Sequence, residues 1–117
     1  MLRKRLKSFK YAFNGLGDLI KTQPNAKIHC FLAIVAIGLG LFLKLSFVEW
    51  SILILTIAIV LTAEAFNTAL EYLTDLVSPD HRPLAGKVKD VAAAGVLLTA
   101  IAALLVGLCL FLPKLLS

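Results

Sequence analysis

Four polar side chains recur along one stretch of an otherwise apolar sequence: Glu64, Asn67, Glu71 and Asp75. They lie at i, i+3, i+7 and i+11, so an α-helix places them on one face. An acidic residue inside a membrane segment costs roughly 2.5 to 3.5 kcal/mol and usually serves a function. Because carboxylate and amide oxygens suit divalent cations, the pattern predicts a metal or substrate site. The alternative is that Glu64 and Asn67 only form hydrogen bonds between helices.

A second polar feature, the pair Lys89-Asp90, directly precedes a long uncharged segment. It is either part of the site or an ordinary membrane-edge pair, since an acidic side chain is favoured near a helix N-terminus. The sequence has no G-x-x-x-x-G-K-[ST] loop and no Ser-His-Asp or Cys-His order typical of hydrolases. A nucleotide would therefore be held by metals, lysines and carboxylates. The histidines His29 and His81 are isolated in the sequence and are assigned no role.

The composition places this polar face in a membrane protein. Of 117 residues, 60% are hydrophobic and only 16% are charged, whereas a soluble domain needs a more polar surface. The length allows a single domain, residues 1–117. The net charge is +5 and five basic residues crowd the first ten positions, which indicates anionic lipid head groups as a partner and not nucleic acid. No apolar core or cleavage site follows them, so a signal peptide is not expected.

Apolar periodicity and proline breaks predict four helical segments. Residues 6–21 carry apolar side chains at helical spacing with lysines opposite, typical of an amphipathic helix on the membrane surface. Transmembrane helices are expected at residues 28–43, 47–77 and 91–112. The second is about 45 Å long against about 30 Å of hydrocarbon, so its last third should project from the membrane. The fold class is therefore an all-α integral membrane protein with one interfacial and three transmembrane helices.

The distribution of basic residues predicts the orientation. The N-terminal cluster and the basic residues of 82–89 lie on one side of the membrane, opposite Lys44 and Lys114. The positive-inside rule places the more basic side in the cytoplasm. The amino terminus is then cytoplasmic and the carboxyl terminus is outside.

The residues also resemble a known family. The run EAFNTALE (64–71), followed by Asp75, resembles the signature of the prokaryotic diacylglycerol kinase family, which includes the undecaprenol kinases of Gram-positive bacteria. Residues 87–94 resemble its second conserved block, and residues 9–15 and 24–29 its interfacial helix and the start of its first span. The resemblance implies a homotrimeric lipid kinase of the bacterial cytoplasmic (inner) membrane, dependent on Mg²⁺ and ATP. Its active sites would lie at the cytoplasmic interface and be shared between subunits.

The resemblance further implies a role for each site residue. Glu64 would be the general base for the lipid hydroxyl, and Glu71 would bind the divalent metal that bridges the ATP phosphates. The residues expected to bind the nucleotide are Asn67, Lys89, Asp90 and Tyr11. These roles suit phosphoryl transfer, in which catalysis consists chiefly of positioning and charge neutralisation.

One position departs from the family pattern. The second metal-binding carboxylate of the family is a glutamate that aligns with Gln23. A glutamine offers only a neutral carbonyl oxygen, which binds Mg²⁺ much less well than a carboxylate does. Two outcomes stay open, namely reduced activity or an altered, divergent family member.

The sequence also leaves open the lipid substrate and the functional class of the protein. Undecaprenol and diacylglycerol are both candidate substrates, and residues 81–84 and 45–50 look closer to the undecaprenol kinase branch. A small pore-forming protein would also be short, basic-ended and oligomeric, but it would not need carboxylates aligned along one helix. A structural or regulatory membrane subunit, including a family member that lost catalysis through Gln23, would bind partners without consuming ATP.

Overall fold

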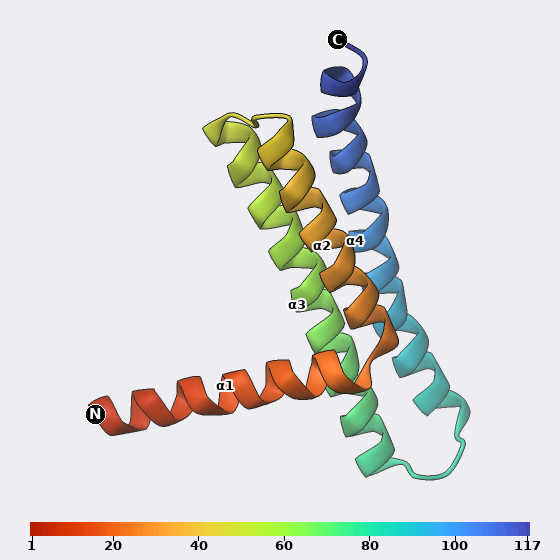
Figure 1. The fold of residues 1–117 in the computed structure, drawn as a ribbon. Coiled ribbons are helices and arrows are strands. Elements are labelled where there is room, and N and C mark those ends of the chain that lie inside the picture. Colours follow the sequence, from red (N-terminus) through yellow and green to blue (C-terminus); the bar gives the residue numbers. More distant parts are fainter.

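The computed structural model describes residues 1–117, and all of its secondary structure is helical. The four helices are α1 (Leu2–Thr22), α2 (Pro24–Phe42), α3 (Phe47–Val77) and α4 (Pro83–Leu115). Helices α2, α3 and α4 lie side by side, whereas α1 projects sideways from this group (Figure 1). The predicted all-helical class is confirmed.

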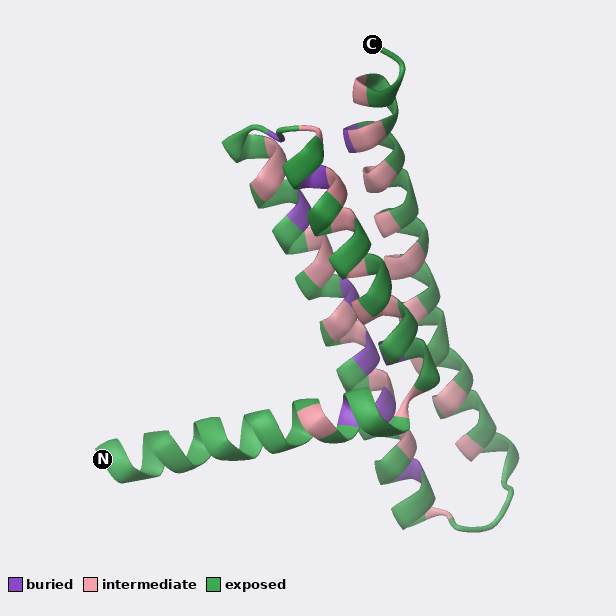
Figure 2. Cartoon of the chain, viewed as in Figure 1, coloured by how far each residue is buried: buried purple, intermediate pink, exposed green.

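The three aligned helices are long and apolar enough to cross a membrane. Only ten of the 117 residues are buried, so most apolar side chains of these helices point outward. Figure 2 shows the buried residues along the inner sides of the helices and an almost fully exposed α1. Soluble proteins rarely expose an apolar surface of this extent to water, so lipid or neighbouring protein must cover it. The chain is a multi-pass membrane protein with three transmembrane helices.

The helix ends differ from the expected segments in places. The helix expected at residues 6–21 begins four residues earlier, and α2 starts before the expected 28–43 segment. The largest difference is at the third span, 91–112, which is the inner part of a helix that begins at Pro83. Proline suits the first position of a helix, where its missing N–H is not needed. Pro113, the first residue after the expected 91–112 segment, lies inside the last turn of α4.

A tight turn joins α2 to α3 and makes them antiparallel. Lys44 adopts the left-handed conformation, with φ 56°, and the N–H of Leu45 donates to the carbonyl of Gly40 at 3.1 Å. Gly40 leaves room for the side chains of Leu45 and Trp50, because an added Cβ would lie 2.9 Å and 3.0 Å from their atoms. The turn therefore fixes which residues of α2 and α3 lie opposite each other.

Hydrogen bonds and an ion pair link the helices at both ends of α3. Ser46 and Glu49 form a reciprocal capping box at the start of α3, and Glu49 also pairs with Lys114 of α4 at 3.2 Å. At the other end, the Tyr72 hydroxyl of α3 donates to Asp18 Oδ2 of α1 at 2.8 Å. The C-terminal end of α1 is thereby attached to α3, while the outer part of α1 makes no contact with the other helices in Figure 1.

Candidate active site

Glu64 lies inside the helix group, with 2% of its side chain exposed. The one basic side chain within 4.0 Å of this carboxylate is His29 of α2, whose Nε2 lies 3.3 Å from Glu64 Oε1. The contact has the distance of an ion pair but not the angle of a good hydrogen bond, so Oε1 has no hydrogen-bond partner. A buried carboxylate is costly unless it is paired and hydrogen-bonded. Glu64 therefore sits in the setting expected of a functional residue, not of a solvated one.

His29 and Glu64 meet because α2 and α3 run antiparallel from the turn around Lys44. At about 1.5 Å per residue, His29 lies about 21 Å before the turn and Glu64 about 27 Å after it. Both residues thus fall toward the same end of the helix group. This end also carries Asn67, Glu71 and the C-terminus of α3.

Asn67 and Glu71 form a second polar pair on α3. Asn67 Nδ2 donates to Glu71 Oε1 at 3.3 Å, while Asn67 Oδ1 is buried without a partner. The hydroxyl of Thr68 is buried without a partner as well. Together with Glu64 Oε1, three unsatisfied oxygens follow one another along less than two turns of α3. Buried polar atoms are normally satisfied. His29 Nε2 faces Glu64 Oε1, so Asn67 Oδ1 and the Thr68 hydroxyl are the two atoms for which a ligand, water or neighbouring chain would supply the partner.

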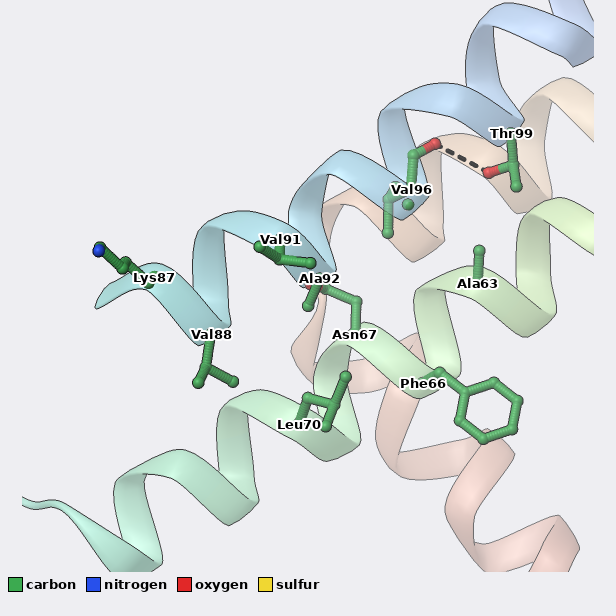
Figure 3. A pocket seen from close by; sticks show the side chains of 11 residues that line it. Ala63, Phe66, Asn67, Leu70, Lys87, Val88, Val91, Ala92, Val96 and Thr99 are labelled. Carbon is green, nitrogen blue, oxygen red and sulfur yellow. Dashed lines mark hydrogen bonds between the residues drawn. The ribbon is translucent and has the colours of Figure 1, made fainter. Parts of the chain in front are cut away.

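A groove of about 720 Å³ runs between α3 and α4 beside this pair. Asn67 points into it toward Ala92, whereas Lys87 points away from the helix pair (Figure 3). The small residues Ala63, Ala92 and Gly95 line the groove and keep it open. The groove is mostly apolar, and Asn67 is its inward-pointing polar group.

Lys89 and Asp75 join α4 to the C-terminal part of α3. Lys89 Nζ donates to Asp75 Oδ1 at 2.7 Å. Both side chains are largely exposed, and exposed ion pairs contribute little to stability. The pair instead holds a cationic group beside the helix that carries Glu71.

Gln23 lies between α1 and α2 and bonds to its own neighbour. Its Nε2 donates to Thr22 Oγ1 at 3.3 Å, and Thr22 Oγ1 lies 3.3 Å from the Tyr72 hydroxyl. Asp90 and Tyr11 are exposed and make no side-chain hydrogen bond or ion pair. The single chain therefore brings together Glu71 with Asn67 and Lys89 with Asp75, but it joins none of these to Asp90 or Tyr11.

The chain contains no cluster of three or more His, Cys, Asp or Glu side chains that could hold a metal by themselves. Magnesium rarely uses such a cluster, because it commonly takes one or two carboxylates together with phosphate oxygens and water. The Glu71 carboxylate is a ligand of the kind it prefers, and the Asn67 amide turns its Nδ2 toward that carboxylate. The residues present thus fit a magnesium ion shared with a nucleotide.

Three residues of this region were not predicted from the sequence, namely His29, Thr68 and Tyr72. His29 faces Glu64, the Thr68 hydroxyl is buried without a partner, and Tyr72 donates to Asp18. One signal was available for His29. A carboxylate within a membrane helix requires a partner at the same depth, and His29 is the ionisable residue at that depth of the first span.

Comparison with known proteins identifies the class. Residues 10–111 match the family described as Prokaryotic diacylglycerol kinase. The chain belongs to this family. The matched range includes Tyr11, Gln23 and all of the site residues on α3 and α4, so the resemblance expected from the sequence is confirmed.

Similar family members carry the names of two lipid kinases. Undecaprenol kinase of Bacillus subtilis (strain 168) is 37% identical over 114 residues, which cover 97% of this chain and 93% of the relative. Diacylglycerol kinase of Synechocystis is 44% identical over 113 residues, which cover 96% of this chain and 65% of the relative. Diacylglycerol kinase of Haemophilus influenzae is 31% identical over 91 residues, which cover 78% of this chain and 77% of the relative. This family member is thus a lipid kinase whose lipid the comparisons leave open.

Proposed function

We propose that this kinase transfers the γ-phosphoryl group of ATP to the hydroxyl of a membrane lipid alcohol, undecaprenol or diacylglycerol. The observation that carries the proposal is the buried carboxylate of Glu64, which has an unsatisfied oxygen within an apolar helix group. A lipid hydroxyl near the membrane edge can reach such a group, whereas a water-soluble alcohol has no reason to partition there.

Glu64 serves as the general base in this proposal. It takes the hydroxyl proton while the alcohol oxygen forms a bond to the γ-phosphorus. The bond between that phosphorus and the bridging oxygen breaks at the same time, and ADP leaves with the electron pair. The lipid phosphate and ADP are the products, and the proton remains on Glu64 until it returns to water.

The nucleotide is proposed to lie along the polar side of α3 and the start of α4. Lys89 would exchange its contact with Asp75 for a phosphate oxygen, and Asn67, Asp90 and Tyr11 would order the nucleotide. Glu71 would hold Mg²⁺, which offsets the phosphate charge when bound, and Gln23 occupies the position of the family's second metal ligand.

A homotrimer with shared sites accounts for what one chain lacks. Asp90 and Tyr11 form no side-chain hydrogen bond or ion pair with the other site residues within the chain. Apolar side chains cover most of the outer helix surfaces, which suits packing against further copies. We place the assembly in the bacterial cytoplasmic (inner) membrane with the amino terminus and the site on the cytoplasmic side, as the basic residues indicate. The α1 helix would then lie on the membrane surface.

Gln23 supports a second candidate, a family member with little or no turnover. Its side-chain amide is engaged with Thr22, and its neutral oxygen is a weak magnesium ligand. Such a protein would keep the fold and nucleotide binding but would act as a structural or regulatory subunit. Family membership gives no support to the pore-forming alternative.

The test is phosphate transfer by the purified protein in mixed micelles, with Mg·ATP and each lipid alcohol in turn. Glu64→Gln should abolish transfer and leave the oligomer intact. Glu49→Gln is the matched control, because it changes a glutamate at the opposite end of the same helix. Retention of the rate in Glu64→Gln would remove the general-base assignment. No transfer to either lipid, with or without Gln23→Glu, would rule out the kinase proposal for this chain.

A further inference from the structure

The contact between His29 and Glu64 is the least exposed of the three contacts between basic and acidic side chains in this chain. The other two ion pairs, Lys89 with Asp75 and Lys114 with Glu49, are considerably more exposed. Of the His29 side chain, 19% is exposed, against 2% of Glu64. No lysine or arginine lies within 4.0 Å of the Glu64 carboxylate. His29 is therefore the one basic side chain of this chain within that distance of the Glu64 carboxylate.

The other charged groups described near this end of the molecule are bonded to other residues, point away from the helix pair or are exposed. On α3, Glu71 accepts from Asn67, and on α1, Asp18 accepts from Tyr72. On α4, Lys89 is held by Asp75. Lys87 points away from the helix pair (Figure 3), and Asp90 is exposed. His29 is thus the group on the neighbouring helices that faces the Glu64 carboxylate.

An imidazole in this position can orient a base. Nε2 faces Oε1 at 3.3 Å without a hydrogen bond in this structure. A small rotation of the imidazole would let Nε2–H donate to Oε1 and leave Oε2 for another contact. Hydrogen bonds to a carboxylate are stronger than neutral ones, and the effect grows where the surroundings are poor in water. The separation of 3.3 Å is long for such a bond, but catalytic hydrogen bonds commonly shorten only when substrate is bound.

We propose that His29 is a positioning residue for Glu64. It donates from Nε2 to Oε1 and aims Oε2 at the lipid hydroxyl. The inference rests on the proposed role of Glu64 as the general base. It assigns a function to the one histidine that the membrane spans contain, since His81 lies in the loop between α3 and α4.

Three variants test the proposal in the mixed-micelle kinase assay. His29→Leu removes the donor, and His29→Gln replaces it with an uncharged N–H donor. His81→Leu is the matched control, because it removes the other of the two histidines at an exposed position. We expect His29→Leu to lower kcat about 10- to 100-fold, the usual effect of losing a hydrogen bond to a charged group, with KM for ATP nearly unchanged. His29→Gln should recover most of this loss, and His81→Leu should have no effect.

The pH profile separates positioning from mere packing. Because the donor that His29→Leu removes faces the proposed general base, the acidic limb of the kcat profile should differ between this variant and the wild-type protein. A packing defect would lower kcat at every pH and leave the limb in place.

A second measurement does not depend on kinase activity. Hydrophobic carbodiimides react with protonated carboxyl groups, and mass spectrometry locates the adduct. At neutral pH, Glu64 should be labelled more slowly in the wild-type protein than in His29→Leu, with Glu64→Gln as the background. If the wild-type protein transfers no phosphate but this difference is found, the pairing of His29 with Glu64 holds and the kinase proposal fails.

Three results would overturn the positioning role. The first is a kcat of His29→Leu within about twofold of wild type. The second is an equal loss in His29→Leu and His29→Gln with an unmoved acidic limb, which would indicate packing alone. The third is the same labelling rate of Glu64 with and without His29.

Discussion

Shortening Glu64 by one methylene group is the sharpest perturbation that the proposed site allows. Glu64→Asp keeps the negative charge but draws the carboxylate back along α3 by one carbon–carbon bond, about 1.5 Å. The separation from His29 Nε2 would grow from 3.3 Å to beyond 4 Å, and the reach to the lipid hydroxyl would shrink equally. The backbone of α3 cannot follow, because this turn is hydrogen-bonded within a long helix packed between α2 and α4.

The size of the effect follows from this displacement. A misplacement of about 1 Å in a reacting group costs about 100-fold in rate, which corresponds to about 2.7 kcal/mol in the activation free energy. We therefore expect kcat of Glu64→Asp to fall about 100-fold while KM for ATP stays nearly constant, because Glu64 is not proposed to touch the nucleotide. Initial rates in mixed micelles at saturating lipid give both quantities.

The control is Glu49→Asp, the same chemical change near the other end of α3. Its kcat should be unchanged, although a weakened capping box lowers stability slightly. The reasoning is refuted if Glu64→Asp keeps kcat within threefold of wild type, because a general base with fixed geometry cannot tolerate that shift. A large rise in KM for ATP at constant kcat would instead place Glu64 among the nucleotide ligands.

The remaining predictions concern the metal and the packing. Gln23→Glu should raise Mg·ATP-dependent turnover, and no gain in a folded protein would mean that the alignment or the metal role is wrong. Chelation of divalent cations should abolish phosphate transfer without changing the helical circular dichroism, and a loss of helix instead would make the metal structural. Gly40→Val should lower the melting temperature in detergent by the equivalent of about 1–3 kcal/mol, because Leu45 and Trp50 already fill that space. A Cβ added at Gly38 would have nothing within 4 Å, so Gly38→Val should leave the melting temperature nearly unchanged. Equal effects of the two variants would contradict the packing described for the turn.

The sequence predicted the helices well because their causes are local. The uncharged runs are long enough to span hydrocarbon, and Pro24 and Pro83 mark where chain segments change direction. The third span was expected at residues 91–112, whereas the helix that contains it extends back to Pro83 through the basic residues before Val91. Charge sets how deep a residue lies in the membrane, but it does not end a helix, and Pro83 at the first position favours helix from there on.

The candidate site was predicted only in part, for a reason that is not local. The spacing of Glu64, Asn67 and Glu71 correctly indicates one side of a helix. The spacing does not show that Glu64 faces α2 while Asn67 faces α4. The two side chains lie about 60° apart around the axis of α3. That division depends on where the neighbouring helices lie. His29 was missed for the same reason, since its importance comes from the turn that brings α2 back along α3.

The small number of buried residues has a consequence for any measurement on this protein. With ten of 117 side chains buried, little of the hydrophobic stabilisation arises inside a single chain, and most must come from whatever surrounds it. A melting temperature recorded in one detergent therefore describes the protein together with that detergent. Variants are comparable only when the micelle, the lipid content and the degree of assembly are held constant.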